Sequence, residues 1–214
     1  MPELWKLHDA ILNGDAKTAV AVTQEALAEN VPPLELVQKY MVPAMDQVGQ
    51  RFECEEYFVP ELLLAARAMK GSLELIRPLL VASGAEPAGR VAIGTVKGDL
   101  HDIGKNLVSA MLEGGGFEVI DLGADVSPEK FVNAVKERGA KIVALSALLT
   151  VTMGSMKTTI EALKTAGVRD QVKVLVGGAP VTKQYAEEIG ADGYGENASV
   201  AVSLARTLTK PVSA

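Results

Sequence analysis

The sequence predicts an α/β protein in which an all-α bundle of four helices precedes a doubly wound parallel sheet of five strands, of the flavodoxin or Rossmann-like type. Two observations predict this class. Over residues 1–82 apolar side chains recur at three- and four-residue steps, as on amphipathic helices. Beyond residue 90, short β-branched apolar runs alternate with helical stretches, which is typical of a parallel sheet covered on both faces. We expect a helical domain over 1–82, a linker over 83–90 and an α/β domain over 91–214.

The helices of the first part carry their own start and stop signals. Asn13-Gly14 ends the first helix, and Asp15 caps the second. Pro32-Pro33 opens a third helix, inside which Pro43 predicts a kink or a break. A fourth helix begins near Pro60. The apolar positions that line the third and fourth helices are Leu34, Val37, Met41, Met45, Val48, Phe52, Leu62, Ala66, Met69, Leu73, Ile76 and Leu80.

The second part shows five strand-and-helix repeats. The small and polar stretch 82–89, broken by Gly and Pro, predicts an interdomain linker and a candidate hinge. Strands are expected over 91–96, 117–121, 141–146 and 172–176, with a short fifth strand near 192–194. Helices fit residues 104–113, 128–138, 153–166, 182–189 and 197–208.

Composition narrows the function classes. Hydrophobic residues make up 48% and charged residues 22%, and the net charge is −6, which argues against a nucleic-acid binder. No apolar run approaches the length of a bilayer span, and residues 1–6 lack the pattern of a signal peptide, so we expect a cytoplasmic protein without a membrane segment. Cys54 is the only cysteine, which excludes an internal disulfide and a cysteine-built zinc site.

The loop after the first strand, residues 98–106, holds one of only two histidines. In open parallel sheets, ligands bind outside the carboxyl ends of the strands, where the strand order reverses. Asp99 and His101 are two residues apart, so the carboxylate can accept the Nδ1 hydrogen and leave Nε2 free as a ligand or base. The other histidine, His8, is interpreted as a solvent-facing residue.

Small and hydroxylated residues follow the later strands. Ser146 ends the third strand, Thr150 and Thr152 follow it, and Gly177-Gly178 ends the fourth. Together they outline a slot into which a bulky planar group could enter. Because no second or third protein ligand accompanies His101, a ligand that brings its own metal suits this edge. The aromatic stretch 57–61 is equally consistent with core packing and with covering a flat ligand.

Three ordered motifs and a helix resemble a known family. Asp99 to Gly104 is similar to the D-x-H-x-x-G signature of cobalamin-binding proteins in which a histidine replaces the cofactor's lower base. Ser146 to Leu148 and Gly177-Gly178 resemble the later S-x-L and G-G motifs of that family. The stretch 57–69 resembles the cap helix of the methyl-carrying branch, so the chain resembles the corrinoid proteins of methyltransferase systems and the cobalamin module of methionine synthase.

The resemblance implies a cobalamin cofactor, methylcobalamin or a related corrinoid, with His101 as the cobalt ligand. Asp99 and Thr152 would complete the catalytic group, because Thr152 matches a serine that extends the His–Asp pair in methionine synthase. Phe52 and Val59 match cap positions that shield the methyl face. The residues that would contact the cofactor below its ring are Gly98, Asp99, Leu100, His101, Asp102, Gly104, Ser146, Leu148, Thr150, Gly177, Gly178 and Ala198.

The function that the resemblance implies is methyl carriage by a subunit that is no complete enzyme alone. It would accept a methyl group on Co(I) from the substrate of a partner methyltransferase. It would donate that group from methyl-Co(III) to a second methyltransferase acting on tetrahydrofolate or a thiol, with a reductive activase as a further partner. Three alternatives stay open: the small subunit of an adenosylcobalamin-dependent mutase, a cobalamin-sensing regulator, and a flavodoxin-like receiver without a cofactor.

Overall fold

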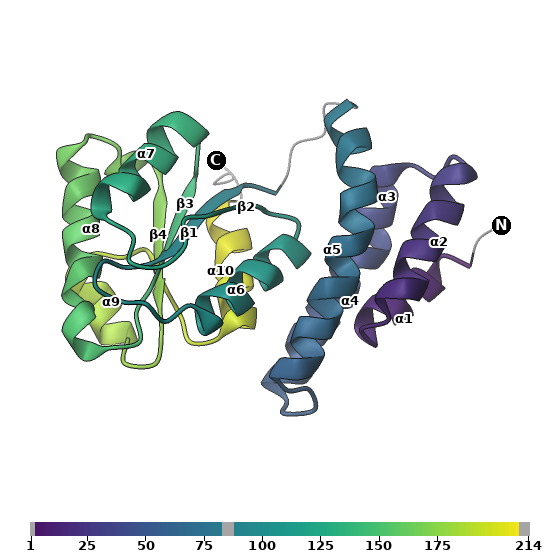
Figure 1. Cartoon of the computed structure of the whole chain (residues 1–214), viewed down its shortest axis with the longest axis horizontal. Coiled ribbons are helices and arrows are strands. Elements are labelled where there is room, and N and C mark those ends of the chain that lie inside the picture. The colour runs from purple at the N-terminus through teal and green to yellow at the C-terminus, as the bar shows by residue number, and fades with distance from the viewer. Residues whose placement is uncertain (1–2, 83–87, 210–214) are drawn as a thin grey trace. The chain divides into compact units, whose positions relative to one another are not determined.

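The structure is a computed structural model that describes residues 3–82 and 88–209, with the backbone alone at Val81. It divides into two compact units, and residues 110–116 group with the first of them. The first unit holds helices α1 to α5 and the second holds the sheet (Figure 1). Residues 83–87, which make up most of the expected linker and hinge, lie outside the described residues.

The first unit is built from helices with the expected signals. These are α1 (Trp5–Leu12), α2 (Ala16–Ala28), α3 (Pro33–Leu36), α4 (Val42–Glu53) and α5 (Val59–Ala82). Asp15 caps α2 as predicted, since its Oδ1 accepts the Thr18 amide at 3.0 Å. Gly14, with φ +72°, makes the turn between α1 and α2. Most of the predicted apolar stripe is buried, but Leu34 is exposed.

Pro43 does not break the third predicted helix. Residues Val37–Met41 form one π-helical turn between α3 and α4, and Pro43 lies in the first turn of α4. A proline ring lacks an amide hydrogen and collides with the carbonyl four residues earlier in a regular helix. We infer that the wider turn before Pro43 relieves this collision and lets the helical path continue from Pro33 to Glu53.

His8 is not the solvent-facing residue that the sequence suggested. Only 12% of its side chain is exposed. The Trp5 ring meets the imidazole edge-on with centroids 5.4 Å apart, and Nδ1 lies 3.1 Å from Asp9 Oδ1. Trp5 lies one helical turn before His8, so its indole covers a position that would otherwise face water.

The second unit contains a fully parallel five-stranded sheet in the order β2-β1-β3-β4-β5. Its strands are β1 (Arg90–Thr95), β2 (Glu118–Asp121), β3 (Ile142–Ser146), β4 (Lys173–Gly177) and β5 (Gly193–Gly195). The order reverses between β1 and β3, as expected for the flavodoxin-like topology, so the carboxyl ends of these two strands flank the switch point.

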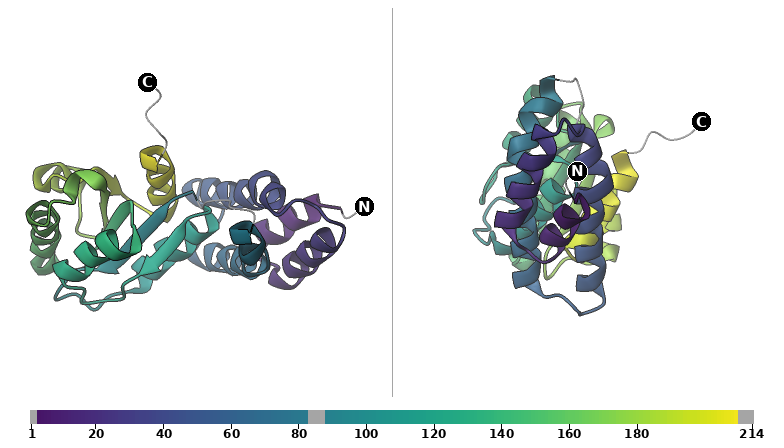
Figure 2. Two further views of the ribbon diagram at one scale, coloured as in Figure 1. Left: turned by 90° about the horizontal axis from the view of Figure 1, so that it is seen from above. Right: turned by 90° about the vertical axis from the view of Figure 1, so that its right-hand side faces the viewer.

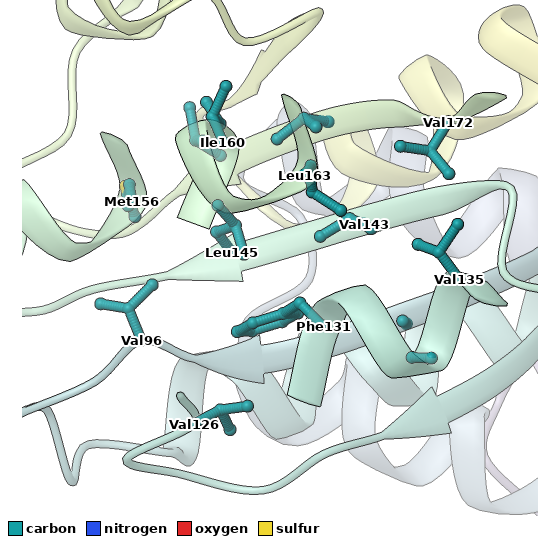
Figure 3. Close-up of a cluster of buried hydrophobic side chains, with 14 of the residues drawn as sticks. Val96, Val126, Phe131, Val135, Val143, Leu145, Met156, Ile160, Leu163 and Val172 are labelled. Carbon is teal, nitrogen blue, oxygen red and sulfur yellow. The ribbon is translucent and has the colours of Figure 1, made fainter. Parts of the chain in front are cut away.

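Helices cover both faces of this sheet. They are α6 (Ile103–Gly114), α7 (Pro128–Arg138), α8 (Gly154–Thr165), α9 (Lys183–Ile189) and α10 (Ala198–Thr209). Figure 1 shows α6 and α10 on one side of the sheet and α7, α8 and α9 on the other, and Figure 2 gives two further views. Phe131 of α7 and Met156 of α8 pack with Leu145 in a buried apolar cluster on the second side (Figure 3).

The first side, beneath α6 and α10, has a row of small residues at its carboxyl end. Thr95 of β1 is the register partner of Ser146 on β3, which in turn pairs with Gly177 and then Gly195. Strand residues one position away, such as Leu145 and Val176, face the opposite apolar cluster. The small row therefore forms a floor without bulky side chains at this edge. Among the described residues, no helix is both long and apolar enough to cross a membrane.

Candidate functional site

The loop that carries His101 leaves β1 at the switch point and is fixed by its own backbone. Gly98 adopts φ +87°, a left-handed conformation that favours glycine, and the Asp99 amide donates to the Val96 carbonyl at 3.1 Å. The Thr95 hydroxyl donates to the His101 carbonyl at 2.8 Å. These contacts hold the loop between β1 and α6 in one conformation.

Asp99 is the most heavily bonded side chain of this edge, and no part of it is exposed. Its Oδ1 accepts from the His101 amide at 3.1 Å and lies 2.8 Å from His101 Nδ1. Its Oδ2 accepts from the amides of Leu148 and Leu149 at 2.8 and 3.2 Å. The Thr152 hydroxyl also donates to Oδ2, at 2.7 Å. The Asp99 carboxylate therefore joins the loop after β1 to the loop after β3.

These hydrogen bonds keep Asp99 ionised. Burial by itself would raise the pKa of the Asp99 carboxyl. The bonds from Thr152, from the Leu148 amide and from His101 act in the opposite sense and together hold this pKa well below its usual range. A carboxylate that stays charged next to an imidazole can hold the imidazole hydrogen on the near nitrogen.

His101 has the geometry of a metal ligand or base. A carboxylate can only accept, so Nδ1 carries the hydrogen toward Asp99, and in the neutral imidazole Nε2 then keeps its lone pair. Within the described ranges, no hydrogen bond involves Nε2, and 49% of the His101 side chain is exposed. The arrangement fixes the tautomer and leaves one nitrogen available to a ligand at the edge of the sheet.

Thr152 lies behind Asp99 and is buried, as the sequence prediction of a His–Asp–hydroxyl group requires. Its Oγ1 lies 2.7 Å from Asp99 Oδ2 and 2.8 Å from the Leu149 carbonyl. A hydroxyl has one hydrogen to donate, so these two acceptors compete for it. The threonine hydroxyl can therefore donate to the carboxylate, and its orientation is compatible with the predicted role.

Two nearby groups were not predicted from the sequence. Asp125, in the loop after β2, accepts the Gly98 amide at 2.8 Å and donates its own amide to the Asp99 carbonyl at 2.9 Å. Lys105, on the first turn of α6, bonds both carboxylate oxygens of Asp121 at 2.7 and 2.6 Å. Sequence spacing does not connect either pair, because each joins β2 or its loop to a segment that precedes it by 16 residues or more.

The predicted glycines differ in what they do. A side chain on Gly178, which has φ +127°, would collide with the Ala147 carbonyl oxygen, so this glycine serves the packing of two loops. A Cβ on Gly177 would lie 2.8 Å from the Gly195 carbonyl oxygen. In contrast, a Cβ on Gly104 would meet nothing within 4 Å. Gly104 is therefore an exposed position three residues after His101.

Exposed apolar side chains lie on the same two loops as His101 and Thr152, or directly beside these loops in the chain. Ile103 and Val151 are 83% and 85% exposed, and neither was predicted as a site residue. Leu100 and Leu148, which were predicted, are exposed as well. Exposed aliphatic side chains on the loops at the carboxyl ends of the strands are typical of a surface that binds a large apolar ligand.

The remaining predicted residues lie in two places. Asp102 precedes α6 and accepts from Asn106 Nδ2 at 3.1 Å, Thr150 is exposed on a 3-10 turn, and Ala198 is buried at the start of α10. Phe52 is half-buried on α4 and Val59 is exposed at the start of α5, both in the first unit. A role for these two beside His101 stays a prediction.

The residues at this edge fit a corrinoid. A corrinoid brings its own cobalt, and His101 Nε2 would be the protein nitrogen that holds it. In the described part of the chain, no three His, Cys, Asp or Glu side chains gather as an independent metal site. Ser109, one turn after Lys105 on α6, has a buried hydroxyl without a hydrogen-bond partner among the described residues, which a polar group of an inserted tail could satisfy.

Comparison with known proteins agrees with this fit. Two family models, each described as a B12 binding domain, match residues 89–203 and residues 4–77. Trimethylamine corrinoid protein 1 of Methanosarcina acetivorans is 46% identical over 95% of each chain. The dimethylamine corrinoid protein of Methanosarcina barkeri is 44% identical over 96% of each chain, and a corrinoid protein of Desulfitobacterium hafniense is 42% identical over 97% of this chain and 98% of its own length.

Solved structures show the same similarity over the full fold. A cobalamin-binding protein from Desulfitobacterium hafniense superposes with a TM-score of 0.80 at 34% identity, covering 97% of this chain and 99% of its own. A chain of the methanol:cobalamin methyltransferase complex MtaBC from Methanosarcina barkeri superposes with a TM-score of 0.84 at 29% identity, covering 96% and 79%. A receiver without a cofactor is therefore no longer an option, and the chain belongs to the family of B12-binding corrinoid proteins, homologous to the methylamine corrinoid proteins.

Proposed function

We propose that this corrinoid protein is a methyl carrier that shuttles between two methyltransferases and is not a complete enzyme alone. It receives the methyl group from the substrate of one partner and delivers it to a second methyltransferase, which acts on tetrahydrofolate or a thiol. The donor we propose is a methylated amine, because trimethylamine and dimethylamine corrinoid proteins are similar to the chain over nearly its whole length. A reductive activase completes the set of partners.

The observation that carries this proposal is the fixed Asp99–His101 pair at the switch point. When bound, the corrinoid supplies a cobalt ion that can accept a methyl group and give it up again. His101 Nε2 would ligate that cobalt, and Asp99 would hold the hydrogen at Nδ1 and so increase the donor strength of the imidazole. Thr152 would support Asp99 from the buried side.

The other predicted residues would bind the cofactor rather than react with it. The small row of Thr95, Ser146 and Gly177 would leave room for the displaced nucleotide tail. Gly104 would allow the macrocycle to approach the loop closely. In this proposal Phe52 and Val59 shield the methyl face, and the linker 83–90 acts as the hinge between the domains 1–82 and 91–214. The exposed free thiol of Cys54 suits the reducing cytoplasm in which we place the protein.

Two alternatives from the sequence receive less support. The mutase-subunit alternative does not account for the B12-binding match over residues 4–77, nor for full-length similarity to methylamine corrinoid proteins. A cobalamin-sensing regulator would need a basic DNA-reading element, which the net charge of −6 does not favour.

The ligand assignment is tested with His101→Ala and His8→Gln, the two histidine positions of the chain. Each purified protein is mixed with hydroxocobalamin and its visible spectrum is recorded. We expect His8→Gln to give the wild-type spectrum and His101→Ala to lose the histidine-ligated form. An unchanged spectrum in His101→Ala rules out the ligand assignment.

The carrier role is tested separately. The reduced holoprotein is incubated with trimethylamine, dimethylamine or methanol and the corresponding partner methyltransferase, and methylation of the cofactor is followed by its absorbance. Methylation from an amine supports the proposed donor, and methylation from methanol alone would redirect it. If no partner loads the holoprotein, and adenosylcobalamin binds far more tightly than methylcobalamin, the mutase alternative replaces methyl carriage.

A further inference from the structure

We propose that Asp125 is a positioning residue for His101, acting through the backbone of Gly98 and Asp99. The proposal rests on the proposed function in one respect, since it takes His101 as the cobalt ligand. Asp125 itself would touch neither cofactor nor substrate. It lies on the loop after β2, whereas His101 lies on the loop after β1.

Asp125 holds two peptide groups of the histidine loop at once. Its Oδ1 accepts the Gly98 amide at 2.8 Å, and its backbone amide donates to the Asp99 carbonyl at 2.9 Å. The two loops are also joined by a parallel β-bridge between Val96, two residues before Gly98, and Val126, the residue after Asp125. The peptide unit before Gly98 and the peptide unit after Asp99 are therefore both bonded to one residue of the neighbouring loop, and Gly98 and Asp99 lie between these two points.

Asp125 makes these two hydrogen bonds from an uncommon backbone conformation. Its φ is +51°, in the left-handed region that costs most residues about 1 kcal/mol and that Asp and Asn tolerate best. This conformation accompanies the two bonds described above, one from the side chain and one from the backbone of the same residue. We infer that the hydrogen bonds offset the backbone cost.

The orientation of His101 depends on the position of the Asp99 backbone and on the position of the Asp99 carboxylate. Asp125 fixes the backbone of Asp99, and the amides of Leu148 and Leu149 fix the carboxylate. Because the backbone and the carboxylate of Asp99 are both held, the Oδ1 atom is fixed in the position from which it contacts His101 Nδ1. If the backbone end is released, the carboxylate remains with the loop after β3, but Gly98 and Asp99 gain freedom and the imidazole contact loosens.

Lys97 allows the effect of the Asp125–Gly98 hydrogen bond to be separated from the effect of the negative charge of Asp125. Its Nζ lies 2.9 Å from Asp125 Oδ1 and 3.0 Å from Oδ2, but the Lys97 and Asp125 side chains are 57% and 39% exposed, and ion pairs in contact with water contribute little to stability. Lys97→Met removes this ion pair and leaves the bond to Gly98. Asp125→Asn likewise removes the charge and keeps an oxygen acceptor. Asp125→Gly removes the acceptor without adding strain at positive φ.

The first experiment needs no cofactor. Imidazole nitrogen spectra of the full-length apoprotein, recorded at about pH 8 where free imidazole is neutral, report the tautomer of each of the two histidines. We expect His101 in the Nδ1–H form in wild type, Asp125→Asn and Lys97→Met, and a mixture of tautomers in Asp125→Gly. His8 serves as the internal control and keeps its signals in all four proteins.

The second experiment measures affinity for hydroxocobalamin by titration. Loss of one positioning hydrogen bond predicts about tenfold weaker binding in Asp125→Gly, with a smaller fraction of the histidine-ligated spectrum and with the other two variants at wild-type levels. A wild-type tautomer and wild-type affinity in folded Asp125→Gly overturn the proposal. If that variant does not fold, a folded Asp125→Asn with mixed tautomers overturns it instead. Failure of the ligand assignment would appear only in the His101→Ala spectrum and would leave the apoprotein result intact.

Discussion

The Oδ2 atom of Asp99 lies 2.8 Å from the backbone nitrogen of Leu148, although 49 positions of the chain separate the two residues. The bond joins the loops that follow β1 and β3, on either side of the point where strand order reverses. Asp99 thus has two tasks. It orients His101, and it closes the sheet edge on which the cofactor site would rest.

Because Asp99 joins the two loops, we expect Asp99→Asn to lower the stability of the protein by an amount that depends on pH. An amide nitrogen in place of one carboxylate oxygen would face donors, so we expect a loss of about 2–3 kcal/mol in the free energy of unfolding at neutral pH. Because the folded-state pKa of Asp99 is lowered, its contribution is complete above the ordinary aspartate pKa of about 4 and is lost as the pH falls toward the lowered value.

Urea unfolding at several pH values between neutrality and the acid range measures this effect. The difference between wild type and Asp99→Asn should be constant at higher pH and shrink in acid. Asp170→Asn, at an exposed aspartate on a short turn, is the matched control and should show no such difference. A wild-type-to-variant gap that grows in acid would contradict the prediction.

Two glycines of the site predict opposite outcomes for the same substitution. Gly178→Ala places a methyl group against the Ala147 carbonyl at positive φ, so it should cost at least about 3 kcal/mol or prevent folding. Gly104→Ala meets open space and should leave thermal stability within about 0.5 kcal/mol of wild type. If the macrocycle approaches Gly104, this variant should still bind hydroxocobalamin more weakly. Wild-type affinity in Gly104→Ala would place the cofactor elsewhere on the rim.

The Lys105–Asp121 ion pair is asymmetric in its burial, and this predicts unequal losses. The Lys105 side chain is 2% exposed and that of Asp121 is 45% exposed. Asp121→Ala leaves a buried ammonium group without its partner, for which we expect a loss of about 3 kcal/mol. Lys105→Met leaves a carboxylate that water can solvate and should cost about 1 kcal/mol or less. Chemical denaturation of both variants checks the order, and equal losses would contradict it.

Tyr57 ties the turn between α4 and α5 to the end of α1. Its hydroxyl donates to the Leu12 carbonyl at 3.3 Å and accepts from Arg51 at 2.9 Å, and the guanidinium carbon lies 5.1 Å from the ring centroid. Tyr57→Phe should therefore lower the free energy of unfolding by about 1 kcal/mol. Tyr40→Phe is the matched control, with an expected change below about 0.5 kcal/mol. Similar losses in the two variants would show that the hydroxyl contacts of Tyr57 contribute nothing specific.

Periodicity and local signals were sufficient for most of the fold. The positions of the strands follow from short apolar runs, and those of the helices from apolar residues at three- and four-residue steps. Asp15 and Gly14 act as the cap and the turn that their residue types predict. The π turn at 37–41 was not predictable, because a proline inside a helical pattern indicates that something must yield but not which turn yields. His8 was misjudged because its burial depends on the Trp5 ring rather than on its own residue type.

The same distinction applies to the site: the contact between neighbours in sequence could be predicted, and the contacts between distant segments could not. Asp99 and His101 are two positions apart, so their contact follows from sequence alone. Thr152 needed a resemblance to be connected with them, because 53 positions separate it from Asp99. Asp125 and the Lys105–Asp121 pair were missed because contacts across a parallel sheet depend on strand order, and no local pattern encodes that order.

The row of small residues beneath α6 and α10 has a consequence for the entropy of cofactor binding. Gly177 and Gly195 have no side-chain rotamers, and Thr95 and Ser146 have few, whereas ordering one long flexible side chain costs about 1.5–2 kcal/mol. A tail that enters above this row therefore restricts almost no side-chain motion in the floor. The backbone of this row is already ordered by the sheet, so in the proposed site little conformational entropy of the floor would be lost when the tail binds.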